Sequence, residues 1–149
     1  MSDINHDPSI KKIEENLSYL ARWLEANNRR RNYPLERAHY LLLRLLTEKS
    51  PQSSGVLALQ LGLDSSTVTR QIKAMIDLDL IERLADPTDR RGCLINVTPI
   101  GIEKFNETQA KKRTNTAKVF HEWTSDEKAS LAHLLAKLNE SISKNLDNN

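Results

Sequence analysis

The sequence predicts a mainly α-helical fold that carries one small β-hairpin. Two short apolar segments, residues 80–85 and 93–97, flank a charged loop containing Pro87 and Gly92, a pattern typical of two strands joined by a turn. The segment just before them has helical spacing and a polar, basic side. A helix followed by an arginine-bearing hairpin can contact a DNA duplex twice, in the major groove and in the adjacent minor groove. We therefore predict a winged helix-turn-helix.

The composition fits one soluble domain, with or without a separate oligomerisation element. The chain has 149 residues and a net charge of only +2, so affinity for a nucleic acid must come from where its charges lie. One cysteine, Cys93, excludes an internal disulfide framework and a cysteine-rich zinc site. The N-terminus lacks the features of a secretory signal, and no apolar run reaches the roughly 20 residues that span a bilayer. We expect a cytoplasmic protein without a metal or other cofactor.

Two helices are predicted before residue 50. Apolar residues recur at helical spacing from Ile10 to Leu24, which indicates a first helix over residues 9–28. The arginine-rich segment 29–34 ends in proline and breaks this pattern. Residues 35–48 carry a broad apolar face and predict a second helix, and residues 50–53 are expected to form a turn.

The next two helices form the predicted helix-turn-helix. A short helix with apolar residues from Val56 to Leu61 should end at Gly62, because glycine suits the left-handed position just past a helix end. Leu63 can fold back onto the last turn, and Asp64 is a good N-cap for the following helix. This order of a short helix, a tight corner and a second helix is that of a helix-turn-helix.

Two long helices are predicted after the hairpin. Pro99 suits the first turn of a helix that runs to about residue 120. Thr124 and Glu127 fit a capping box at the start of the last helix. The apolar residues of that helix fall on one side and are Leu131, Leu134, Leu135, Leu138 and Ile142.

The segment over residues 65–78 is the candidate recognition helix. At about 100° per residue, Val68, Ile72, Met75 and Ile76 fall on one side and are expected to pack inward. Hydroxyl-bearing and basic residues occupy the other side, and such groups suit base edges and phosphates. An ordinary solvated helix face is the alternative, but the helix-turn signal before it and the hairpin after it favour DNA contact. The predicted DNA-binding residues of this helix are Ser65, Ser66, Thr67, Thr69, Arg70 and Lys73.

The hairpin and the helices before it resemble those of the MarR family of transcriptional regulators. The segment from Asp89 to Thr98 resembles that family's D-x-R-x5-L-T wing signature, and residues 63–70 resemble part of its helix-turn-helix. The resemblance covers about residues 10–145. Two positions depart from the family pattern. Val97 replaces the usual leucine, and Asp79 stands where the family often has glycine, although aspartate can adopt the left-handed conformation.

The resemblance implies a homodimer that binds a palindromic operator, with half-sites about one helical turn apart. Residues 34–98 would form the DNA-binding lobe, and residues 9–30 and 99–146 would supply the dimerisation helices. Packing of those helices within one chain is the competing explanation for their apolar sides. The residues expected in the dimer interface are Ile10, Ile13, Leu17, Leu134, Leu138 and Ile142.

The same resemblance assigns roles at the wing. Arg91 is expected to enter a minor groove, Asp89 to brace it, and Arg90 to contact phosphate. Both roles of Arg91 and Asp89 are physically reasonable, because a narrow minor groove concentrates negative potential and a carboxylate can hold a guanidinium by paired hydrogen bonds. An exposed turn whose charges merely aid solubility is the alternative.

Many MarR relatives release DNA when a small aromatic or phenolic molecule binds, which implies an effector of that kind here. Trp23, His39 and Tyr40 are the candidate lining residues, with ordinary core or surface positions as the alternative. Cys93 fits a small apolar strand residue better than a redox switch.

We predict a sequence-specific DNA-binding transcriptional regulator, acting as a homodimeric repressor, and no enzymatic activity. The four histidines are scattered, and the chain lacks a His-Glu-x-x-His motif, a glycine-rich phosphate loop and a nucleophile elbow. The first alternative is a winged-helix protein-interaction module that does not bind DNA. A small enzyme is the second, and the missing catalytic motifs disfavour it.

Overall fold

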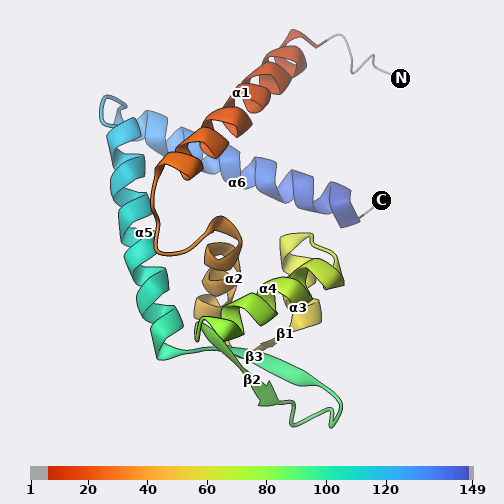
Figure 1. The fold of residues 1–149 in the computed structure, drawn as a ribbon. Helices are drawn as coiled ribbons and strands as arrows, with labels where there is room; N and C mark the ends of the chain where they lie inside the picture. The colour runs from red at the N-terminus through yellow and green to blue at the C-terminus, as the bar shows by residue number, and fades with distance from the viewer. Residues whose placement is uncertain (1–6, 148–149) are drawn as a thin grey trace. The chain divides into compact units, whose positions relative to one another are not determined.

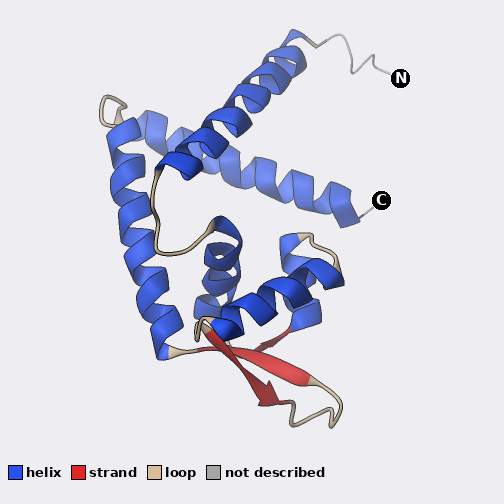
Figure 2. Cartoon of the chain, viewed as in Figure 1, coloured by secondary structure: helices blue, strands red, loops and turns tan. Residues whose placement is uncertain are grey.

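The computed structural model describes residues 7–147, which form six helices and one three-stranded antiparallel sheet (Figure 1). The predicted mainly helical fold with a hairpin is confirmed, as the helices and strands in Figure 2 show. In chain order the elements are α1 (Pro8–Arg30), α2 (Arg37–Glu48), β1 (Gln52–Ser53), α3 (Ser54–Leu61), α4 (Ser65–Asp77), β2 (Ile81–Ala85), β3 (Cys93–Val97), α5 (Pro99–Val119) and α6 (Ser125–Asp147).

The chain divides into two compact units, one ending at Tyr33 and the other starting at Pro34. The first unit contains α1, in which no described residue is buried. The second unit contains every other element and the whole hydrophobic core. None of the helices described over residues 7–147 combines the length and the apolar character that crossing a membrane requires.

The core of the second unit fixes the orientation of α4. Val68, Ile72 and Met75 are at most 2% exposed and pack with leucines of α2, with Leu57 of α3 and with residues of the sheet. Burying a side chain of this size stabilises the fold by about 1.5–3 kcal/mol, so three such residues hold the helix firmly in one rotation. The predicted inward side of α4 is confirmed, and its polar side therefore faces solvent.

The predicted helix-turn-helix corner between α3 and α4 is also confirmed. Gly62 adopts a left-handed φ of 61°, and the Leu63 amide folds back to donate to the Ala58 carbonyl at 3.0 Å. At the start of α4, Asp64 Oδ1 accepts a hydrogen bond from the Thr67 amide at 2.7 Å, as an N-cap should.

A short strand replaces part of the turn that the sequence predicts over residues 50–53. Gln52 and Ser53 form β1 and pair with Ile95 and Leu94 of β3, which makes β3 the central strand in the order β1-β3-β2. The Gln52 side chain donates to the Leu45 carbonyl at 3.1 Å and to the Lys49 carbonyl, so it caps the end of α2. β1 thereby links the hairpin strand β3 to the end of α2.

The junction between α4, β2 and α5 is held by backbone bonds and one hydroxyl. Asp79 has a left-handed φ of 57°, which confirms that aspartate takes the conformation expected at this position. It lets the amides of Asp79 and Leu80 cap the carbonyls of Ile76 and Met75 at the end of α4. Thr98 Oγ1 donates to the Asp79 carbonyl at 2.6 Å and accepts from the Gly101 amide at 3.0 Å.

Gly101 allows α5 to approach this junction closely. A Cβ atom at Gly101 would lie 2.1 Å from the Leu80 carbonyl oxygen, well inside contact distance. The end of α4, the start of β2 and the start of α5 are therefore joined at one point.

Candidate nucleic-acid interface

The outward side of α4 offers hydroxyls and two basic groups to solvent. Ser65, Ser66, Thr69, Arg70 and Lys73 are all exposed. Thr67, also predicted as a DNA contact, is half-buried and points less freely outward. A helix that presents such a set on one side has the dimensions and the hydrogen-bonding groups for the major groove of DNA.

The N-terminus of α4 is organised by the Asp64 carboxylate. It accepts from the Ser66 hydroxyl at 2.5 Å, from the Thr67 hydroxyl at 2.7 Å and from the Thr67 amide at 2.7 Å. These hydrogen bonds, the one from Ser66 first, hold the pKa of Asp64 well below its usual range. The carboxylate is therefore ionised at neutral pH and acts only as an acceptor.

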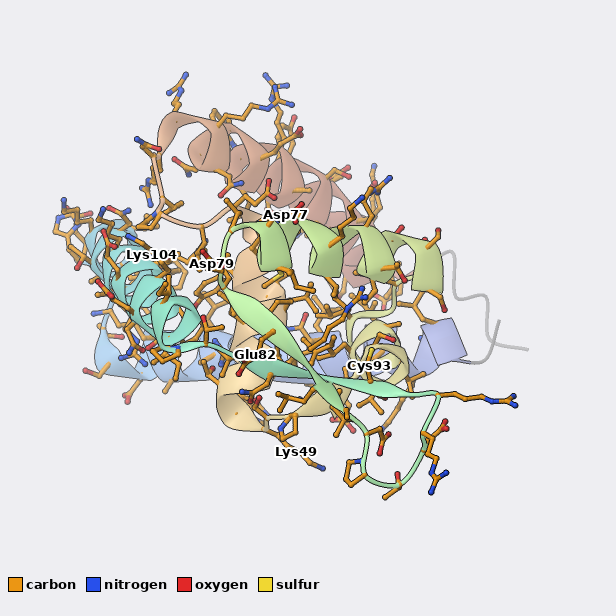
Figure 3. All side chains as sticks on the ribbon, turned by 60° about the horizontal axis from the view of Figure 1, so that its bottom comes forward. Lys49, Asp77, Asp79, Glu82, Cys93 and Lys104 are labelled. Carbon is orange, nitrogen blue, oxygen red and sulfur yellow. The ribbon has the colours of Figure 1, made fainter. Side chains whose placement is uncertain are left out.

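The opposite end of α4 is acidic. Asp77 and Asp79 are exposed where the helix turns into β2 (Figure 3). Carboxylates repel phosphate, so this end of the helix suits a position away from the DNA backbone. The hydroxyl-rich N-terminal half is the part suited to enter a groove.

The wing tip is shaped by two aspartates that fold onto the main chain. Asp86 Oδ1 accepts from the Thr88 hydroxyl at 2.7 Å and from the Thr88 amide at 2.8 Å, and these bonds lower the pKa of Asp86. Asp89 Oδ1 accepts from the Arg91 amide at 2.9 Å, and the Gly92 amide donates to the Asp89 carbonyl at 3.0 Å. Both carboxylates thus stabilise the turn that presents the arginines.

The contact between Asp89 and Arg91 differs from the expected one. The sequence suggests a carboxylate bound to the Arg91 guanidinium, whereas the carboxylate binds the Arg91 main-chain amide. Within residues 7–147 no ion pair involves the side chain of Arg90 or Arg91, and both residues are exposed. Asp89 therefore braces the wing tip by fixing its backbone, and both guanidinium groups are available to a partner.

Arg83 is a candidate contact that the sequence reasoning missed. It pairs with Ile95 across β2 and β3, and side chains alternate along a strand, so it shares a sheet face with Ile81 and Ile95. Ile81 and Ile95 belong to the core that packs under α4, while Arg83 lies further along β2 and is exposed. An exposed cation on the helix-facing side of the wing suits a phosphate contact. The alternation Ile81, Glu82, Arg83 was the signal that could have found it.

The outer side of the wing is held by a polar chain. The Val97 amide donates to Ser50 Oγ at 3.3 Å, the Ser50 hydroxyl donates to Asn96 Oδ1 at 2.8 Å, and Asn96 Nδ2 donates to Glu82 Oε1 at 2.8 Å. Figure 3 shows Glu82 on β2, with Cys93 at the loop end of β3. Cys93 is exposed and carries a free thiol. Among the described residues, no group of three or more His, Cys, Asp or Glu side chains could hold a metal ion.

The predicted effector residues are Trp23 in the first unit and His39 and Tyr40 in the second. Trp23 is 60% exposed on α1, and His39 is buried in α2 with its Nε2 atom 2.9 Å from Glu36 Oε1. Tyr40 does line a pocket of about 290 Å³ between α2 and α5, in the second unit. The other lining residues are Arg44, Gln109, Lys112, Arg113 and Thr116.

This pocket has an aromatic wall and a cationic rim. Tyr40 stacks on Phe105 with ring centroids 5.2 Å apart, and Lys112 Nζ lies 5.0 Å from the centre of the Tyr40 ring. Arg44 and Arg113 add two more positive charges to the lining. The sequence could not reveal this site, because its residues on α2 and those on α5 are more than 60 positions apart in the chain.

The residues expected at a dimer interface are mostly uncovered in the single chain. Ile10 and Ile13 on α1 and Leu134 and Ile142 on α6 are each between 47% and 59% exposed, and Leu17 is 38% exposed. Leu138 is half-buried. Both helices thus present apolar side chains to solvent.

The fold and the exposed groups of α4 and the wing are those of a winged-helix DNA-binding transcriptional regulator. Residues 35–93 match the profile of the MarR family. The chain is 34% identical over 141 residues to YxaD of Bacillus subtilis (strain 168), described as an uncharacterized HTH-type transcriptional regulator, and the match covers 93% of this chain and 97% of that protein. The chain belongs to the MarR family.

Solved structures show the same fold. A MarR family protein from Bacillus stearothermophilus matches with a TM-score of 0.76 and 23% identity, covering 91% of this chain and 96% of that one. The PcaV transcriptional regulator from Streptomyces coelicolor, solved in complex with its natural ligand, matches with a TM-score of 0.67 and 17% identity, covering 95% and 98% of the two chains. These relatives are transcriptional regulators and not enzymes, as the sequence predicts.

Proposed function

We propose that the protein is a homodimeric, cytoplasmic repressor that binds a palindromic operator. The observation that carries this proposal is that one compact unit presents both the hydroxyl-rich and basic side of α4 and the unpaired arginines of the wing. A second copy would supply an equivalent pair of contacts. Two recognition helices related by a twofold axis then read half-sites about one helical turn, or 10–10.5 base pairs, apart.

The exposed apolar residues of α1 and α6 support a dimer. Soluble monomers rarely expose large contiguous apolar surfaces. In the first unit, Ile10, Ile13 and Leu17 recur at helical spacing along α1 and remain 38–50% exposed. In the second, Leu134, Leu135 and Ile142 on α6 remain 39–59% exposed. A second copy of the chain is the partner that covers both.

Titration of the full-length protein against duplexes from the DNA upstream of its own gene tests this function. A regulator that contacts phosphates releases counterions, so its affinity should fall steeply with rising salt concentration. Its affinity for the operator should also exceed that for a scrambled duplex of the same length. A winged-helix module that binds only proteins would show neither the sequence preference nor the steep salt dependence.

The pocket between α2 and α5 supports a second, finer proposal, that an anionic aromatic effector controls DNA binding. The Tyr40 ring suits an aromatic ligand, and Arg44 and Arg113 suit its carboxylate. PcaV, which shares the fold, was solved with its natural ligand bound. Isothermal titration with 4-hydroxybenzoate tests this proposal. The Arg113→Ala variant should bind this probe more weakly than the wild type, and a neutral phenol should bind both proteins alike.

A further inference from the structure

Two of the hydroxyl groups on the outward side of α4 already donate within the protein. The Ser66 hydroxyl donates to Asp64 Oδ1 at 2.5 Å, and the Thr69 hydroxyl donates to the Ser65 carbonyl at 2.8 Å. A hydroxyl group has one hydrogen to donate and two lone pairs that accept. Once that hydrogen is committed, the group can only accept a hydrogen bond from DNA.

We propose that the Asp64 carboxylate and the Ser65 carbonyl take up the hydroxyl hydrogens of Ser66 and Thr69, respectively, so that these two side chains act as hydrogen-bond acceptors and read the exocyclic amino groups of adenine or cytosine. In the major groove the only base donors are the N6 amino group of adenine and the N4 amino group of cytosine. Phosphate oxygens, guanine O6 and N7, and thymine O4 are all acceptors and cannot donate to these hydroxyls. The inference rests on the proposed operator binding and specifies which base edges are read.

The bond from Ser66 is strong enough to survive contact with DNA. Its acceptor is an ionised carboxylate, and hydrogen bonds to charged acceptors are shorter and stronger than those between neutral groups. Asp64 also holds the Thr67 hydroxyl and amide, so its carboxylate is fixed by three donors and cannot turn away easily. Thr69 is held differently, by the backbone of its own helix one turn earlier.

The donors on the same side of α4 are therefore different residues. Arg70 and Lys73 are exposed and carry only donor groups, which suit guanine and phosphate. Within the described residues no hydrogen bond is recorded for the Ser65 hydroxyl, so Ser65 can still donate to phosphate. The helix thus combines fixed acceptors at Ser66 and Thr69 with fixed donors at Arg70 and Lys73.

The experiment starts from duplexes that the full-length protein selects from a random pool. Each adenine of a selected duplex is replaced in turn by purine, which lacks the amino group, and each cytosine by pyrimidin-2-one. Wild-type affinity should fall about threefold to tenfold at one or more positions, as expected for loss of a single hydrogen bond. Wild type and variant are compared on the same duplex, so changes in duplex stability cancel.

Two variants assign the loss to a hydroxyl. Ser66→Ala should become insensitive to the amino group at one of these positions, and Thr69→Val, which keeps a similar shape, at another. Ser65→Ala is the matched control, because it should weaken all duplexes alike. If Ser66→Ala also weakens all duplexes alike, the hydroxyl contacts phosphate and the inference is overturned.

A third variant tests the role of Asp64 as a positioning residue. Glycine is tolerated at an N-cap with little loss of stability, so Asp64→Gly should retain the fold, which thermal unfolding would check. It removes both carboxylate oxygens, so the Ser66 hydroxyl loses its acceptor and can donate outward. We expect Asp64→Gly to accept guanine or thymine at the Ser66 position. Asp64→Asn is the matched control, because the Oδ1 atom that caps the Thr67 amide also accepts from Ser66, and this variant should keep the wild-type base preference. An unchanged base preference in Asp64→Gly overturns the role of Asp64, even if the affinity rises.

Failure of the inference can be told from failure of the proposed function. A wild-type protein that prefers its selected duplexes but ignores every amino-group deletion retains the function and contradicts the inference. A wild-type protein that enriches no sequence from the pool contradicts both.

Discussion

At the scale of single residues, Gly101 shows most directly how the sequence dictates the position of the DNA-binding elements. We expect Gly101→Ala to lower the free energy of unfolding by about 1–3 kcal/mol or more, since its Cβ would lie 2.1 Å from the Leu80 carbonyl oxygen. Urea denaturation measures this change. Gly55→Ala in α3 is the control, because nothing lies within 4 Å of its added Cβ, and it should instead stabilise the protein slightly. Equal stability of the two variants would contradict the close approach of α5.

Asp79 permits a second test at this scale. Its φ of 57° lies in the left-handed region, where glycine is unstrained and alanine is not. Asp79→Gly should therefore be more stable than Asp79→Ala by about 1 kcal/mol or more, as chemical denaturation would measure. Asp77 lies two residues earlier inside α4, and there the order should reverse, with Asp77→Ala the more stable variant.

The lowered pKa of Asp64 predicts that its substitution changes how the stability of the protein depends on acid pH. The pKa of Asp64 in the folded protein is lowered by hydrogen bonds, chiefly from Ser66. A lowered pKa means that the stabilisation is present above the unfolded value of about 3.9 and is lost as the pH falls below it toward the folded pKa. Asp64→Asn cannot titrate, so its stability should fall less steeply than that of the wild type below about pH 4. If the free energies of unfolding of the two proteins fall equally steeply below about pH 4, Asp64 does not contribute in this way.

At the scale of elements, the wing and α4 make separable contributions to DNA binding. Arg70→Ala should weaken binding to the operator by about 1–3 kcal/mol if Arg70 reads a base, and by less on random duplex. Equal losses on both duplexes would identify a phosphate contact instead. Fluorescence anisotropy on the two duplexes distinguishes these outcomes.

Substitutions in the wing should affect DNA affinity through a different contact from those in α4. Arg91→Ala should lower DNA affinity without changing the oligomeric state, because the exposed Arg91 side chain makes no ion pair within residues 7–147. Asp89→Ala should also lower the affinity, since the Arg91 amide loses its acceptor and the tip becomes less ordered. Asp89→Asn keeps an acceptor oxygen and should restore part of the loss. A gel-shift series with unchanged affinity for Arg91→Ala would refute the wing assignment.

The same elements show how far sequence reasoning reaches. The helix-turn-helix corner and the hairpin strand at 93–97 were predicted correctly because their signals are local, in Gly62, Asp64 and the turn residues. Strand β1 was missed because two residues carry no periodicity and depend on distant Ile95 and Leu94 for pairing. The main-chain brace from Asp89 depends on loop geometry, which composition does not specify.

At the scale of the whole molecule, the proposed dimer can be tested by a substitution on α6. Ile142→Glu on α6 places a charge on a side chain that is 48% exposed in one chain. If a second copy covers it, burying that charge is costly, and the variant should be largely monomeric in sedimentation equilibrium. Ser141→Glu, on an exposed neighbouring position, is the matched control. Operator affinity should fall together with the dimer fraction.

The Thr98 hydroxyl, which bridges the Asp79 carbonyl and the Gly101 amide, has a mechanical consequence. These two hydrogen bonds join the start of α5 directly to the end of α4, so the two helix ends cannot move far relative to each other. Any tilt of α5 must then be transmitted to α4 and to the hairpin together. In the proposed dimer, such a tilt would change the spacing between the two α4 helices while each α4 and its wing keep their own structure.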